Sequence, residues 1–222
     1  MKKRIRLIIF DLDGTLVNAY PAIEESFRYV MKKIGQSSPN SLTIRRAVGW
    51  GDRHLLRPFV GEKGLSLALK LYRAHHVWSL IRKTRFLIGA KELIKKLRKR
   101  GYRLSVASNR PTRFSHIILR TLNIRDDFDY ILCGDKMKRA KPHPDILLKI
   151  LKKCKVTPTQ ALYVGDMSVD ILAGKRAHIK TIGVATGSNT KRELQKLKPY
   201  RVIDRVSLVY SIAEELNNHQ QR

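Results

Sequence analysis

Two carboxylates, Asp11 and Asp13, are the residues of this chain best spaced to do chemistry. They follow an apolar run, residues 5–10, that is typical of a buried strand. Residues two apart on an extended chain point to the same side, and Gly14 lets the backbone turn sharply behind them. Two anions held this close repel each other, and a divalent cation would relieve that repulsion. The stretch therefore predicts a metal-assisted acid site, although Asp and Gly also favour ordinary surface turns.

Further polar residues follow later apolar runs or precede a helix. They are Ser108, Asn109, Lys141, Asp166 and Asp170. Each alone has an ordinary structural explanation, but together they form a carboxylate cluster with one hydroxyl and one ammonium group. Carboxylate oxygens suit Mg²⁺, while the hydroxyl and the ammonium could hold a phosphoryl group beside it. In such chemistry one carboxylate can act as the nucleophile and another can protonate the leaving oxygen.

The elements that must position these residues alternate between strand and helix after residue 87. We predict strands at 103–107, 130–133, 161–164, 181–184 and 202–203, and helices at 90–100, 112–122, 145–154, 168–177, 191–197 and 207–216. This alternation indicates βαβ units and a parallel sheet covered on both faces. Ligand sites in such sheets lie at the carboxyl ends of the strands, where the polar residues are found.

The stretch from Val17 to about Arg85 has a different rhythm. Its apolar residues recur at three- and four-residue steps over 22–34, 42–48, 54–60 and 65–81, and no strand is evident. We therefore predict an α/β fold with an inserted all-helical domain.

Composition limits the class of protein. The chain has 222 residues and a formal net charge of +28, and no apolar run approaches the length of a membrane span. The charge has two explanations: solvated helix faces, or attraction to phosphorylated metabolites or nucleic acid. Cys133 and Cys154 share no metal-like spacing and are typical of free thiols in a reduced, cytoplasmic protein.

The order of the motifs resembles that of the haloacid dehalogenase (HAD) superfamily, in its phosphatase branch. The matching motifs are Asp11-Leu12-Asp13-Gly14-Thr15-Leu16, Ser108-Asn109, Lys141-Pro142 and Gly165-Asp166-x-x-x-Asp170. The match covers nearly the whole chain. It implies the HAD fold, with a Rossmann-like catalytic core at residues 1–16 plus 87–222 and a helical cap domain at 17–86.

The resemblance also implies roles for the acids. Asp11 would be the nucleophile, and Asp13 the general acid that later acts as the base for water. Mg²⁺ would be held by Asp11, by the backbone carbonyl of Asp13 and by Asp166. Asp170 would orient Lys141 or a metal-bound water, and so belongs to the same metal site.

For the substrate, the resemblance implies that Ser108 and Asn109 bind phosphoryl oxygens and that Lys141 stabilises the nucleophile and the phosphate. In the helical insert, Gly49-Trp50-Gly51 resembles the cap loop of phosphoglycolate phosphatases. Arg53 and His54 beside it are candidate anion contacts, or else part of an exposed basic turn. Two departures from the pattern, Asn18 in place of an acid and Ile88 in place of proline, leave the subfamily open.

These observations predict a Mg²⁺-dependent phosphatase of small phosphate monoesters, phosphoglycolate-like, that works through an aspartyl phosphate on Asp11. The alternatives are a β-phosphoglucomutase-like phosphoryl transfer, a nucleotidase or pyrophosphatase on the same core, or a basic nucleic-acid-associated protein. A haloacid dehalogenase would lack the second acid, so Asp13 argues against it. The partner would be a small phosphorylated metabolite, with no membrane association, and the protein would be a monomer or a homodimer.

Overall fold

Six parallel strands form the central sheet of the structure, a computed structural model that describes residues 5–218. Their order is β5 (Tyr130–Cys133), β4 (Arg103–Ser108), β1 (Leu7–Phe10), β6 (Ala161–Gly165), β7 (Lys180–Val184) and β8 (Arg201–Ile203). The chain builds outward from β1 in both directions, so the strand order switches beside β1. The carboxyl ends of β1, β4 and β6 therefore meet at the position where parallel α/β sheets bind ligands.

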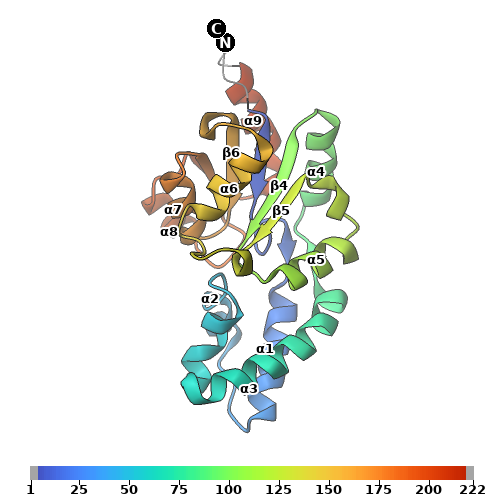
Figure 1. Ribbon diagram of the computed structural model, residues 1–222, viewed down its shortest axis with the longest axis vertical. Coiled ribbons are helices and arrows are strands. Elements are labelled where there is room, and N and C mark those ends of the chain that lie inside the picture. The colour runs from blue at the N-terminus through green and yellow to red at the C-terminus, as the bar shows by residue number, and fades with distance from the viewer. Residues whose placement is uncertain (1–4, 219–222) are drawn as a thin grey trace.

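Helices cover both faces of this sheet (Figure 1). They are α4 (Ala90–Lys99), α5 (Thr112–Thr121), α6 (Asp145–Cys154), α7 (Ser168–Arg176), α8 (Lys191–Lys196) and α9 (Val209–Asn218), with short 3-10 turns at Arg125–Asp127, Gly134–Lys136, Pro158–Gln160 and Val206–Leu208. All four residues of β1 are buried, and they alternate between two apolar clusters. Ile8 and Phe10 pack on the side of α4, α5 and α9, whereas Leu7 and Ile9 pack on the side of α6 and α7. The predicted α/β fold with a covered parallel sheet is confirmed.

A helical segment, defined here as residues 20–83, lies below the sheet in Figure 1. It contains α1 (Tyr20–Lys33), α2 (Ser41–Arg46) and α3 (Asp52–Lys83), and α1 packs along α3. The backbone of α3 is broken at Gly61, whose φ of 64° is non-helical. This break separates the two helices that the sequence predicts at 54–60 and 65–81.

The ends of the predicted helical stretch are not helical. β2 (Val17–Asn18) pairs antiparallel with β3 (Arg85–Phe86), where the chain enters and leaves the helical segment. The prediction that residues 17–85 hold no strand was therefore wrong at both ends. The two connecting segments run side by side and satisfy their backbone hydrogen-bonding groups by pairing. Strands of two residues are too short to show a periodicity in the sequence.

Candidate active site

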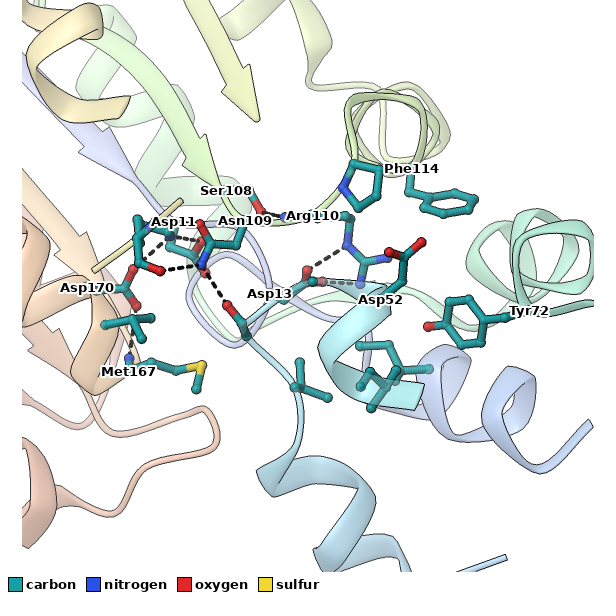
Figure 2. A pocket seen from close by; sticks show the side chains of 18 residues that line it. Asp11, Asp13, Asp52, Tyr72, Ser108, Asn109, Arg110, Phe114, Met167 and Asp170 are labelled. Carbon is teal, nitrogen blue, oxygen red and sulfur yellow. Dashed lines mark hydrogen bonds and ion pairs between the residues drawn. The ribbon is translucent and has the colours of Figure 1, made fainter. Parts of the chain in front are cut away.

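The carboxyl ends of the central strands line a pocket that the helical segment covers (Figure 2). Asp11, Asp13, Ser108, Asn109, Lys141 and Asp170 all line it, as the sequence predicts. The opposite wall includes Ile23 and Tyr72 of the helical segment. The cavity is narrow, with a volume of about 50 Å³.

Lys141 is the central cation of this pocket, and its side chain is only 2% exposed. Its Nζ donates to Asp11 Oδ1 at 2.7 Å and to Asp170 Oδ1 at 2.8 Å. It also donates to the Ala107 carbonyl at 2.8 Å and lies 3.1 Å from the Tyr163 hydroxyl. Burial alone would lower the pKa of Lys141, but the carboxylates of Asp11 and Asp170 raise it well above its usual value. Lys141 is therefore a fixed positive charge beside Asp11.

Asp170 uses both of its oxygens to bind protein groups. Oδ1 accepts from Lys141 and, at 2.6 Å, from the Tyr163 hydroxyl, and Oδ2 accepts from the Met167 amide at 3.0 Å. This arrangement suits a residue that orients Lys141. Tyr163 was not predicted as a site residue, because a tyrosine inside an apolar strand has the pattern of a core residue.

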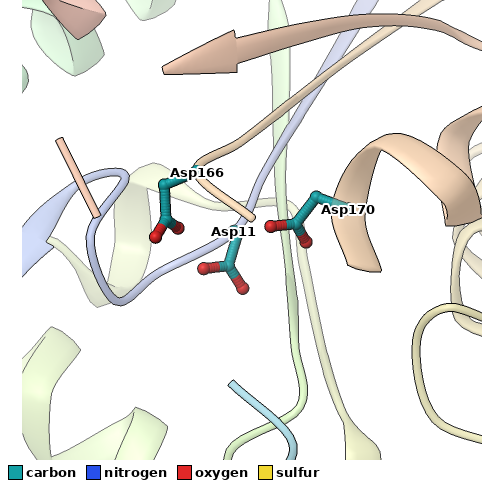
Figure 3. Close-up of side chains that lie close together, drawn as sticks. All are labelled: Asp11, Asp166 and Asp170. Carbon is teal, nitrogen blue, oxygen red and sulfur yellow. The ribbon is translucent and has the colours of Figure 1, made fainter. Parts of the chain in front are cut away.

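Asp11, Asp166 and Asp170 form a buried cluster in which one oxygen from each carboxylate lies within 4.8 Å of the others (Figure 3). Burial raises the pKa of Asp11 to about 7, although Lys141 opposes the shift. Burial, with the charges of Asp11 and Asp170, raises the pKa of Asp166 well above its usual value. Lys141 is bound to two of these carboxylates, and its single positive charge does not balance three of them. The cluster of hard oxygen donors therefore fits a divalent cation such as Mg²⁺.

Hydrogen bonds and the close approach of Gly14 hold Asp166 in place. The Thr15 hydroxyl donates to its Oδ1 at 3.0 Å, and the Ser188 amide donates to its Oδ2 at 3.3 Å. Gly14, with a φ of 79°, makes the turn after Asp13, and a Cβ there would lie 2.4 Å from Asp166 Oδ2. Glycine is therefore required at position 14 both for the turn and for the approach of Asp166.

We expect Mg²⁺ to raise the melting temperature of the protein, and to raise it more near pH 8 than near pH 5. Burial raises the pKa of Asp11 from its usual 3.8 to about 7 in the folded protein. Between pH 3.8 and about pH 7 the folded state therefore binds more protons than the unfolded state. Without metal, this contribution to stability is fully present below the lower value and is lost as the pH rises through the upper one. Mg²⁺ competes with the same protons, so its benefit grows over that window, to about 2.7 kcal/mol at a hundredfold excess over Kd.

Thermal unfolding in Mg²⁺ and in EDTA, over a series of pH values, measures this effect. The Asp166→Asn variant should lose most of the shift that Mg²⁺ causes. A shift that is independent of pH, or that survives unchanged in Asp166→Asn, would contradict the assignment of the cluster as a cation site.

Asp13 lies outside the three-carboxylate cluster and is bound by Arg110. The Arg110 Nε donates to Asp13 Oδ2 at 2.7 Å and its Nη2 donates to Oδ1 at 2.9 Å. Its Nη1 lies 2.8 Å from Nε2 of His76 on α3. Neither Arg110 nor His76 was predicted from the sequence. The only signal for Arg110 was its place after Ser108-Asn109, which does not stand out in a chain with 46 Lys and Arg residues.

The side chain of Asn109 is engaged by the protein. Its Nδ2 donates to the carbonyls of Gly49 at 2.9 Å and Lys141 at 3.0 Å, and its Oδ1 accepts from the Lys141 amide at 2.9 Å. Asn109 thus ties the loop before α3 to the loop that carries Lys141. Ser108 Oγ accepts from the Arg110 amide at 3.2 Å, and its O–H proton has no acceptor within residues 5–218, so it can donate into the pocket.

Arg53 and His54 are not brought to this pocket. Both are exposed, and Arg53 lies 3.6 Å from Glu62 at the surface. α3 begins at Asp52, and it is Asp52 and Leu55, three positions apart on one face, that line the pocket. The helical phase therefore turns Arg53 and His54 away.

Comparisons with known proteins agree with this geometry. The model of the family described as "Haloacid dehalogenase-like hydrolase" matches residues 8–184. The chain belongs to this family. The family match spans β1 to β7 and so includes every strand end that lines the pocket.

Relatives of the chain carry a common name. A phosphoglycolate phosphatase of Psychrobacter arcticus is 30% identical over 210 residues, covering 90% of this chain and 91% of the relative. That of Pseudomonas putida is 29% identical over 212 residues, covering 90% and 76%. The crystal structure of a predicted phosphoglycolate phosphatase from Haemophilus somnus has a TM-score of 0.89 at 27% identity and covers 93% and 97%. This HAD-like hydrolase is therefore similar, along nearly its whole length, to proteins named phosphoglycolate phosphatase.

Over residues 5–218, none of the helices combines the length and apolar character needed to cross a bilayer.

Proposed function

We propose that this HAD-like hydrolase is a Mg²⁺-dependent phosphatase that hydrolyses a small phosphate monoester through an aspartyl phosphate on Asp11. 2-Phosphoglycolate is the first candidate substrate, because the relatives in Psychrobacter arcticus and Pseudomonas putida are named for it. The observation that carries the proposal is the pairing of Asp11 with Lys141 beside two further buried carboxylates, at the pocket that the helical segment covers.

In this proposal the Asp11 carboxylate attacks the phosphorus atom and the bond from phosphorus to the ester oxygen breaks. Asp13 gives its proton to the departing alkoxide. Asp13 then takes a proton from water, whose oxygen attacks the aspartyl phosphate and releases inorganic phosphate. Lys141 holds one Asp11 oxygen at 2.7 Å and keeps the other free for attack.

Asp11, Asp166 and the backbone carbonyl of Asp13 would hold Mg²⁺, with Asp170 in the same cluster through Lys141. When bound, the cation neutralises charge on the nucleophile and on the phosphoryl oxygens. Lys141 and the free Ser108 hydroxyl would meet the phosphoryl group from the protein side. The Asn109 amide would act by fixing the loop of Lys141, since its own donors and acceptor are already bound.

Residues 17–86 would act as a cap domain on a catalytic core of residues 1–16 and 87–222. Two contacts support this division of roles: the Gly49 carbonyl with Asn109, and His76 with Arg110. Both join the helical segment to loops at the sheet edge, so opening of the cap would break them and admit substrate. A closed cap keeps water from the aspartyl phosphate until the alcohol has left.

The narrow cavity favours a leaving group of a few atoms over a nucleotide. A mutase of the β-phosphoglucomutase kind would return the phosphoryl group to a sugar and release no phosphate. Cys133 and Cys154 are both free and buried, which favours a reducing, cytoplasmic setting.

Phosphate release from a panel of esters with Mg²⁺ tests this function. The panel contains 2-phosphoglycolate, sugar phosphates, nucleoside monophosphates and pyrophosphate. We expect turnover that requires Mg²⁺ and is fastest with a small ester. Faster turnover of a nucleotide or of pyrophosphate would reassign the substrate. Tight, salt-sensitive nucleic-acid binding without turnover of any ester would favour the nucleic-acid-associated alternative.

A further inference from the structure

The acid that must protonate the leaving group is bound to another residue in this structure. Both oxygens of Asp13 accept from Arg110, at 2.7 and 2.9 Å, and the two side chains are 13% and 8% exposed. A bidentate pair this buried is strong and geometrically specific. Asp13 therefore needs a competing anion to draw Arg110 away before it can face a leaving oxygen.

With Lys141 assigned to the phosphoryl group, Arg110 is the cation of the pocket that remains for a second anion of the substrate. Among the residues that line the pocket in the described chain, only Lys141 and Arg110 are cationic. Lys141 is already bound by Asp11 and Asp170, with the Ala107 carbonyl close by. Three of the five guanidinium N–H groups of Arg110 donate, two to Asp13 and one to His76, so two have no partner among residues 5–218.

The helical segment fixes the position of this guanidinium. His76 is fully buried, and burial together with the Arg110 charge lowers the pKa of His76 well below its usual value. Its ring is thus neutral: Nδ1 lies 2.9 Å from the Ser26 hydroxyl on α1, and Nε2 accepts from Arg110. Tyr72 and Phe114 line the pocket near Arg110, so an anion that enters meets the guanidinium in a mostly apolar space (Figure 2).

Asp52 also lines the pocket, but it does not compete for Arg110. Asp52 is bound by Arg73 at 2.7 and 3.3 Å. Asp13 is then the partner that an incoming anion would replace on the fork formed by Nε and Nη2 of Arg110. A substrate carboxylate can take over the same two N–H groups in the same fork geometry, because a guanidinium binds any carboxylate in this way.

We propose that Arg110 is the specificity residue of this hydrolase: it binds a second anion on the substrate, a carboxylate beside the phosphoryl group, and in doing so releases Asp13 to serve the leaving oxygen. This inference rests on the proposed phosphatase function and narrows its substrate class to acidic phosphate esters. A neutral ester leaves Arg110 on Asp13 and is turned over slowly.

The test compares 2-phosphoglycolate with 2-hydroxyethyl phosphate, which replaces the carboxylate by a neutral hydroxymethyl group. For the wild type we expect kcat/KM to favour the acidic ester by about a hundredfold or more. In Arg110→Gln that ratio should fall to within about tenfold of unity, and Arg110→Lys, which keeps the charge but loses the fork, should fall between. Arg201→Gln is the matched control, since Arg201 also holds a carboxylate through two nitrogens, but at the surface.

Binding gives a readout that does not depend on turnover. Calorimetry on Asp11→Asn, with and without Arg110→Gln, measures the Kd of each ester. Removing Arg110 should weaken the acidic ester by about tenfold or more relative to the neutral one. An equal loss for both esters, or a wild type that binds and hydrolyses them alike, would overturn the role of Arg110. A wild type that turns over no ester but shows the binding preference would remove the proposed function and keep the anion site.

Discussion

Asp11→Asn is expected to reduce phosphate release by about 10⁴-fold or more, with the fold intact. An amide oxygen is too poor a nucleophile to form the phosphoryl bond, yet asparagine has nearly the shape of aspartate and can still accept from Lys141 at the Oδ1 position. The change also removes one of three clustered carboxylates and so lowers the repulsion among them. We therefore expect the metal-free variant to be at least as stable as the metal-free wild type.

The measurement is phosphate release by wild type and variant, with circular dichroism to establish folding. Acid-quenched wild type should carry the mass of one phosphoryl group, and a peptide that contains Asp11 should hold it. Asp145→Asn is the control, because Asp145 also accepts from a basic side chain, that of Arg139, but this pair lies at the surface. Activity of Asp11→Asn within tenfold of wild type would remove Asp11 as nucleophile.

Lys141→Met is expected to cost about 3–5 kcal/mol of unfolding free energy as well as activity. The ammonium is buried and lies within 2.8 Å of two buried carboxylates, which methionine would leave without their cation. Removing one partner of a buried ion pair leaves the full desolvation cost of the other. The double variant Lys141→Met with Asp170→Asn should recover part of the loss, because it also removes one stranded charge.

Urea denaturation of the single and double variants measures these free energies. Lys191→Met is the control: Lys191 lies 2.7 Å from Asp204, but both side chains are about half exposed or more. Its loss should stay below about 1 kcal/mol. A single Lys141→Met variant as stable as wild type would mean that the buried network around Lys141 adds nothing to the fold.

The proximity of Asp11, Lys141, Asp166 and Asp170 could be predicted from the sequence because it follows from the topology of a parallel sheet. Parallel strands end at one edge, so residues that follow different strands must converge there whatever their separation in the chain. Arg110 and His76 could not be paired in this way. They come from a loop and from a helix of the inserted segment, and only the packing of that segment against the sheet edge decides that they meet.

The candidate contacts in the insert show the same limit at a finer scale. Arg53 and His54 follow a glycine-rich loop at the pocket, yet one step along a helix turns a side chain by about a hundred degrees. A loop position was predictable, whereas the helical phase at Asp52 was not. Asn109 was correctly placed at the sheet edge, but hydrogen bonds to the backbones of Gly49 and Lys141 could not be read from its type.

The short ladder between β2 and β3 has a consequence for how such chains diversify. Asn18 and Arg85 are paired, so the segment between them leaves the sheet-containing part of the structure and returns to it at adjacent positions. A different insert could be spliced in across that ladder without disturbing any strand of the main sheet. Two junctions, after Asn18 and before Arg85, would then suffice to build chimeras that keep Asp11, Lys141 and Arg110 under another relative's helical segment.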